Sequence, residues 1–145
     1  MKFAHISDTH IKNLKYHYEY RIVFEQLYEK LREQNVDYII HCGDIAHTKT
    51  QISPEFVEMC SAFLLNLSKI APTYVILGNH DGNLKNSSRQ DALSPIVEAL
   101  SAPNLFPSHD QTQKEHLNNN YHPNVFLLSS LKETNWAQIV LQQLD

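Results

Sequence analysis

The chain has 145 residues, enough for one soluble globular domain, and 42% of them are hydrophobic, which suffices for a single packed core. Its formal charge of -4 at pH 7 excludes a global electrostatic attraction to nucleic acid or to acidic membranes, and any phosphate binding must therefore be local. Two cysteines without metal-ligand spacing exclude a zinc finger and a disulfide framework. The N-terminus lacks a signal-peptide pattern, and no window reaches the about 20 apolar residues of a membrane span, so we expect a cytoplasmic protein.

Short runs of β-forming residues alternate along the chain with longer runs of helical period, in the order typical of βαβ units. Strands are predicted at residues 2–7, 36–42, 73–77 and 124–130. The sequence therefore predicts an α/β fold with a mostly parallel sheet flanked by helices.

Three helices are predicted between and after the first three strands. The first, of about five turns, carries apolar side chains at helical spacing from Tyr20 to Leu31. The second and third each open with a serine as N-cap followed by proline at the first helical position. These openings are Ser53 with Pro54 and Ser94 with Pro95.

The C-terminal part of the chain is less regular. Residues 103–123 are rich in Asn, Gln, His and Pro, which predicts a long loop with a short edge strand near residues 104–106. A last helix is predicted over residues 133–145, with Thr134 as a candidate N-cap but without a glycine cap or a following strand. Because an α/β sheet rarely finishes on such an element, we expect residues 1–145 to form a single domain that is truncated at its C-terminus.

Polar clusters directly follow each of the first three strands: Asp8 and His10, then Asp44, then Asn79 and His80. The carboxyl ends of parallel strands meet at one edge of a sheet, where open α/β folds bind ligands. Asp8 and His10 are two residues apart, so in an extended strand end both side chains would leave the same face. Asp44 and Asn79 each follow a glycine, which permits the backbone to turn sharply. The three clusters are therefore predicted to form one site.

The side chains of these clusters are typical of a metal site. Carboxylate, imidazole and amide donors suit Mn, Fe or Zn better than Ca, and the absence of nearby cysteine excludes a thiolate site. One central carboxylate can bridge two ions about 3.5 to 4 Å apart, the separation found in hydrolytic two-metal sites.

Three motifs carry a family resemblance: D-x-H at residues 8–10, GDxxH at 43–47 and GNHD at 78–81. They resemble the first three motifs of the calcineurin-like metallophosphoesterases, and within that superfamily the SbcD-type DNA double-strand-break repair nucleases are the most similar. The resemblance implies a partial metallophosphoesterase fold that lacks the C-terminal half of the β-sandwich. It also implies a DNA exonuclease or endonuclease subunit of repair or recombination, two divalent ions with Mn foremost, and a partner ATPase of the SMC-like type.

The resemblance further implies roles for individual residues. Asp8 and His10 would hold one ion, Asp44 would bridge both, and Asn79 would hold the second. A neutral amide at this position leaves more positive charge on the ion than a carboxylate would. His80 would face the scissile phosphate as an acid or a transition-state stabiliser. The residues implied to orient His80 are His47 and Asp81.

The sequence departs from the family after the third motif. The family completes both metal shells with a later histidine and then a GHxH pair, whereas after Asp81 this chain has three histidines but no GH and no HxH. The later histidines, predicted to lie in a loop, are His109, His116 and His122. We therefore expect an incomplete site in this chain.

Five of the twelve basic residues fall in or just after the motif loops and could contact a phosphate backbone. This basic rim consists of Lys12, Lys15, Lys49, Lys85 and Arg89. Three functions stay open: a DNA nuclease, a phosphatase or small-molecule phosphodiesterase with the same metals, and an incomplete domain that only binds DNA or a partner. No GxxxxGK loop occurs, so any ATP use would come from another chain, and a homodimer is compatible with the resemblance.

Two further histidines, His5 and His41, fall within predicted strands. Because most strand positions in such a sheet are covered, both are predicted to be interior histidines with their ring nitrogens satisfied.

Overall fold

The computed structural model describes residues 1–82 and 89–107. Several predictions lie outside these residues: the strand at 124–130, the helix at 133–145, Lys85 and the three later histidines.

Four parallel strands form one sheet in the order β1-β2-β3-β4. The strands are β1 (Phe3–Ile6), β2 (Tyr38–His41), β3 (Thr73–Val75) and β4 (Leu105–Pro107). The predicted α/β fold with a parallel sheet is confirmed, and so is the short strand near residues 104–106. Each of the first three strands ends earlier than predicted, because the last residues of the run already belong to the polar loop.

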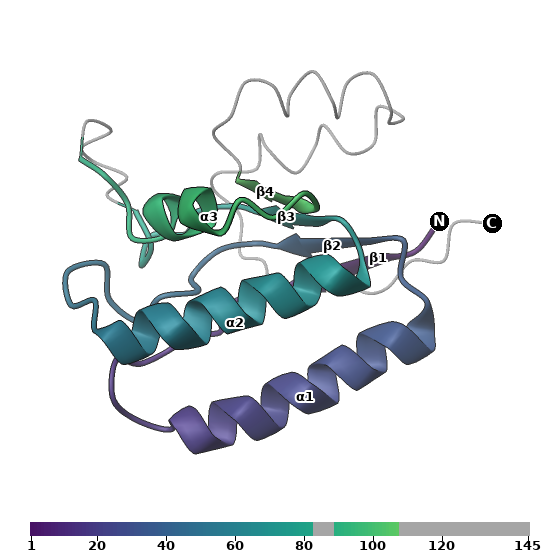
Figure 1. The fold of residues 1–145 in the computed structure, drawn as a ribbon, viewed down its shortest axis with the longest axis horizontal. Helices are drawn as coiled ribbons and strands as arrows, with labels where there is room; N and C mark the ends of the chain where they lie inside the picture. Colours follow the sequence, from purple (N-terminus) through teal and green to yellow (C-terminus); the bar gives the residue numbers. More distant parts are fainter. Residues whose placement is uncertain (83–88, 108–145) are drawn as a thin grey trace. The chain divides into compact units, whose positions relative to one another are not determined.

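Three helices connect neighbouring strands: α1 (His17–Gln34), α2 (Pro54–Ile70) and α3 (Ser94–Leu100). Crossovers between parallel strands are right-handed, and here each leads to the adjacent strand on the same side. The three helices therefore lie on one face of the sheet; Figure 1 draws α1 and α2 below the strands and α3 to the left of β3 and β4.

The core lies between the helices and this face of the sheet. A buried row of side chains crosses the four strands in register: Ala4, Ile39, Thr73 and Leu105. Above it, the ring of Phe24 in α1 stacks on that of Phe63 in α2, with 4.3 Å between centroids. This packing fixes the strand ends from which the polar loops emerge.

The helix starts differ from one another. Ser53 is the N-cap of α2, as predicted, and its Oγ accepts the N–H of Phe56 at 3.1 Å. The prediction of Ser94 as N-cap is wrong, because Ser94 is the first residue of α3 and Leu93 precedes it as the cap. The carboxylate of Asp91 accepts the N–H groups of Leu93 and Ser94 at 2.8 and 2.7 Å. A charged acceptor binds N–H donors more strongly than a hydroxyl, which explains the difference.

The two strand histidines have opposite environments. His41 is fully buried, as predicted, whereas the prediction of an interior position for His5 is wrong, since His5 is exposed. In the register Ile6 pairs with His41, so His5 points to the face opposite the helices.

Among the described residues, no helix combines the length and the apolar character that crossing a bilayer requires.

Candidate metal centre

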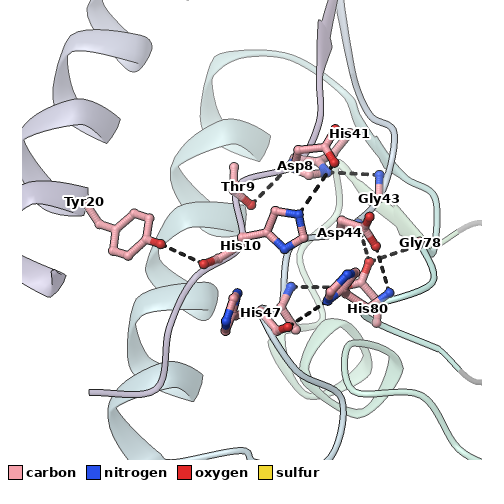
Figure 2. Close-up of polar contacts among 12 residues, drawn as sticks. Asp8, Thr9, His10, Tyr20, His41, Gly43, Asp44, His47, Gly78 and His80 are labelled. Carbon is pink, nitrogen blue, oxygen red and sulfur yellow. Dashed lines mark hydrogen bonds and ion pairs between the residues drawn. The ribbon is translucent and has the colours of Figure 1, made fainter. Parts of the chain in front are cut away.

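Side chains from three loops meet at the carboxyl edge of the sheet (Figure 2). One ligand atom each from His10, Asp44 and His80 lies within 4.8 Å of the other two. Asp8 is beside this group, with its Oδ1 3.6 Å from His10 Nε2. The convergence predicted from the parallel topology is therefore present.

The backbone at this edge is not extended. Asp8, His10 and Asp44 have positive φ values of 57°, 45° and 56°. The prediction that an extended strand end presents Asp8 and His10 on one face is thus wrong, because β1 ends at Ile6 and the loop is left-handed at both residues. Left-handed conformations of non-glycine residues cost of order 1 kcal/mol each and persist where the surroundings hold them.

Main-chain hydrogen bonds hold the first loop against the second. The N–H groups of Asp8, His10 and Ile11 donate to the carbonyls of Gly43, Asp44 and Ile45 at 3.1, 3.0 and 2.8 Å. This ladder continues the pairing of β1 with β2 beyond the strands and fixes the spacing of the loops that carry Asp8, His10 and Asp44.

Asp81 connects the second loop to the third. Its fully buried carboxylate accepts N–H groups of Asp44, Ala46 and Gly78 at 2.7, 2.8 and 2.9 Å. Burial raises the pKa of Asp81, and the three N–H donors, which favour the carboxylate, counteract part of that rise. The observed contacts of Asp81 are with the backbone of two loops, whereas the family resemblance implied an orienting role toward His80.

Two glycines allow these loops to touch. Gly43 has a φ of 101°, which confirms the predicted sharp turn, and a Cβ there would lie 2.5 Å from the backbone nitrogen of Gly78. Gly78 has no positive φ, and its contribution is space: a Cβ at Gly78 would overlap the carboxylate of Asp44. The loops therefore approach at backbone distance.

The ring of His80 is oriented by main-chain groups. Its Nδ1 lies 2.8 Å from the carbonyl oxygen of His47, and a carbonyl only accepts, so the proton is on Nδ1 and Nε2 is available for other chemistry. The backbone N–H of His80 donates to Asp44 Oδ1 at 2.8 Å. The imidazole of His47 is exposed and stacks beside that of His80, 6.3 Å between centroids. His47 thus contacts Nδ1 of His80 through its carbonyl group.

The cluster suits a divalent metal ion. Among the residues that the structure describes, the buried Nδ1 of His10 has no hydrogen-bond partner, a state that a metal ion would relieve. The carboxylate of Asp44 and the imidazole of His10 are typical donors for first-row transition metals. The side chain of Asn79, the predicted ligand of a second ion, is exposed.

The basic rim is only partly free to contact a ligand. Lys49 donates to the carbonyls of Asn79 and Gly82, both at 3.1 Å, and in this way braces the third loop. Lys12 has its ammonium 5.1 Å from the ring centroid of Tyr16. The exposed members in the described part of the chain are Lys15, Lys49 and Arg89.

The sequence did not predict the polar contacts of two residues at this edge, His41 and Tyr20. His41 Nδ1 accepts the N–H of Gly43 at 3.3 Å, and its Nε2 lies 3.5 Å from Thr9 Oγ1. Burial lowers the pKa of His41 to about 4, so the ring is neutral at physiological pH. The hydroxyl of Tyr20 donates to the carbonyl of His10 at 2.7 Å. His41 lies in an apolar strand run and Tyr20 in the apolar stripe of a helix. Both patterns predict burial and give no indication of a polar contact.

The fold is that of an α/β protein, and the cluster places histidine and carboxylate side chains suited to a metal ion at the carboxyl edge of its parallel sheet. The family described as calcineurin-like phosphoesterase matches residues 1–141. The chain belongs to the calcineurin-like phosphoesterase family, whose members are hydrolases that use divalent metals.

Two relatives are informative. The chain is 46% identical over 106 residues to uncharacterized protein R555 of Acanthamoeba polyphaga mimivirus, a match covering 70% of this chain and 8% of that protein. It is 27% identical over 110 residues to the DNA double-strand break repair protein Mre11 of Archaeoglobus fulgidus, covering 72% of this chain and 24% of that protein. The matched region thus spans less than a quarter of the length of either relative.

Proposed function

We propose that this chain hydrolyses phosphodiester bonds with two divalent ions, foremost Mn, and that its substrate is DNA. It would act as an exonuclease or endonuclease subunit in double-strand-break repair or recombination. The observation that carries the proposal is the convergence of His10, Asp44 and His80 at the sheet edge in a member of this family. The similarity to an archaeal Mre11 supports the choice of a nuclease over other phosphoesterases.

The proposed ligand assignment follows the loops. Asp8 and His10 would hold one ion, Asp44 would serve both, and Asn79 would hold the second. The unpartnered Nδ1 of His10 supports the first assignment. The Asp44 carboxylate, which lies within 4.8 Å of ligand atoms of His10 and His80, supports the second. When bound, divalent ions in hydrolytic sites supply Lewis acidity and a water nucleophile at neutral pH.

His80 is proposed to act on the phosphate as an acid or as a stabiliser of the transition state. Its Nδ1 proton is held by the carbonyl of His47, so the ring presents Nε2 in a fixed direction. Because that nitrogen gains a proton in the imidazolium form, it can donate to a leaving oxygen.

The substrate assignment depends on local charge. The chain carries a formal charge of -4, yet Lys12, Lys15 and Arg89 follow the motif loops, and Lys15 and Arg89 are exposed. A DNA backbone bound there would be neutralised locally, which predicts affinity that falls with rising salt concentration.

The test is to assay the full chain with Mn²⁺ on linear duplex DNA and, in parallel, on p-nitrophenyl phosphate. We expect DNA cleavage that EDTA abolishes and that Asp44→Asn reduces. Rapid aryl phosphate turnover without DNA cleavage would reject the nuclease proposal in favour of a phosphatase or small-molecule phosphodiesterase. Binding of DNA without turnover of either substrate would favour the incomplete-domain hypothesis.

The SMC-like ATPase partner and the homodimer stay predictions from the family resemblance. Co-purification with a candidate ATPase tests the first. Sedimentation of the purified chain tests the second.

A further inference from the structure

The first turn of α1 contacts the loop that carries His10. Tyr20 lies in this turn and its ring packs against Phe24, 5.6 Å between centroids. From there its hydroxyl reaches back to the loop and donates to the carbonyl of His10 at 2.7 Å (Figure 2). A hydroxyl anchored by a core contact therefore ends on the backbone of a proposed metal ligand.

A second contact from the same turn holds the loop farther along. His17 Nε2 lies 2.5 Å from the carbonyl oxygen of Lys12. His17 and Tyr20 are three residues apart and hence on the same side of the helix, with 6.4 Å between ring centroids. The helix thus contacts the loop at two carbonyl groups. The one that Tyr20 contacts is the carbonyl of His10, a residue of the candidate metal site.

The His10 backbone needs such support. Its φ of 45° is left-handed, and its N–H is already bound to the carbonyl of Asp44 at 3.0 Å. The Tyr20 hydroxyl binds the other polar group of the residue, the carbonyl, and the Ile11 N–H of the same peptide plane donates to Ile45, so both peptide planes flanking His10 are held. Because φ and ψ are set by the orientation of these planes, the three bonds together aim the imidazole and its unpartnered Nδ1.

We propose that Tyr20 is a positioning residue that aims the imidazole of His10 for metal binding. The proposal rests on the proposed function in one respect, the role of His10 as a ligand. The ring of Tyr20 contributes to packing, and the hydroxyl supplies the positioning.

The experiment compares Tyr20→Phe with Tyr28→Phe in the metal-free full chain. Tyr28 lies two turns further along the same helix, is buried, and hydrogen-bonds Asn66 through its hydroxyl, so the control removes the same atom at a distance from the site. Mn²⁺ affinity is measured by isothermal titration calorimetry, and the melting temperature by circular dichroism. We expect Tyr20→Phe to weaken Mn²⁺ binding by roughly 3- to 10-fold, the effect of one lost hydrogen bond, and Tyr28→Phe to leave it unchanged.

A second measurement does not depend on the metal. Amide hydrogen exchange at residues 8–11 of the metal-free chain should be faster in Tyr20→Phe than in the wild type and unchanged in Tyr28→Phe. Wild-type Mn²⁺ affinity in Tyr20→Phe would overturn the inference, as would unchanged exchange in this loop. A wild-type chain that binds no Mn²⁺ would instead overturn the proposed function, and the exchange data would then decide whether Tyr20 positions His10.

Discussion

The loops at the sheet edge are held in two different ways. The second and third loops are joined by the buried carboxylate of Asp81 and by backbone contact at Gly43 and Gly78. We call this arrangement of Asp81, Gly43 and Gly78 the clamp. The first loop lies outside the clamp and is held by its backbone hydrogen bonds with the second loop and by the Tyr20 hydroxyl.

This difference divides the site into a rigid part and an adjustable part. A buried acceptor with three N–H donors cannot be lost without leaving those donors unsatisfied, so the pair of loops carrying Asp44 and His80 is strongly determined. The bonds of the first loop are individually replaceable by water. We therefore expect substitutions of the residues that join these loops, such as Asp81 and Gly43, to affect folding. Substitutions of the side chains that the loops present, such as Asp44 and His80, should affect metal binding and chemistry.

The largest expected effect is on chemistry at the clamped pair. His80→Ala should lower hydrolysis by roughly 10²- to 10⁴-fold while Mn²⁺ binding persists, because its proposed role is proton transfer. Asp44→Ala should abolish Mn²⁺ binding, because Asp44 is the proposed bridge. Kinetics and calorimetry on both variants check this, and full activity in His80→Ala would remove that residue from the mechanism.

Asp81→Asn should destabilise the fold by about 3 kcal/mol, since an amide supplies one acceptor oxygen for three N–H donors and points its own N–H₂ group at the others. Urea unfolding measures the loss. The control is Asp37→Asn, whose carboxylate is exposed and accepts the N–H of Lys2 at 2.6 Å. Equal stability of the two variants would contradict the clamp.

His41 links the two regions, because it contacts Gly43 in the clamp and Thr9 in the first loop. Burial lowers the pKa of His41 from 6.5 to about 4. Between these two pH values the unfolded chain binds a proton at His41 that the folded protein does not bind. The free energy of unfolding is therefore unaffected by protonation of His41 above pH 6.5, and it falls by up to about 3 kcal/mol as the pH is lowered toward 4.

His41→Asn retains an acceptor for the Gly43 N–H without a titratable ring. Melting temperatures measured from pH 7 to pH 4 should therefore fall less steeply in His41→Asn than in the wild type. Parallel curves would show that another group causes the acid sensitivity.

Gly43→Ala should cost about 2 kcal/mol, because alanine disfavours a φ of 101° and its Cβ would collide with the backbone of the third loop. Gly82→Ala is the matched control, since the nearest heavy atom to a Cβ there is 3.6 Å away. Thermal unfolding separates the two, and a similar loss in both would argue against a specific contact at Gly43.

The smallest effect is expected for the brace on the third loop. Lys49→Met removes two hydrogen bonds to loop carbonyls and should lower the melting temperature by about 2 to 4 °C. Lys15→Met, at an exposed position in the first loop, should not change it. If Lys49 served only as a phosphate contact, both variants would melt like the wild type.

Most of the fold was predictable because it depends on local patterns. Apolar runs of strand length and the proline after Ser53 predict β1, β2, β3 and α2 without tertiary information. The start of α3 was not predictable from Ser94, since the N–H of Ser94 is bound by the carboxylate of Asp91, three residues upstream and with no distinguishing local pattern. The predicted C-terminal ends of β1, β2 and β3 lie too far along the chain, because the loop conformation begins before each apolar run ends.

The sequence by itself determined which loops carry the metal-binding side chains and that they share one edge, because the carboxyl ends of parallel strands coincide whatever the details of packing. Only the tertiary structure decided how those side chains are held. The left-handed backbone at His10, the clamp by Asp81 and the Tyr20 hydroxyl all involve hydrogen bonds to main-chain groups from 3 to 37 residues away. Backbone N–H and C=O groups are the same in every residue, so a sequence pattern does not reveal which of them a side chain will bind.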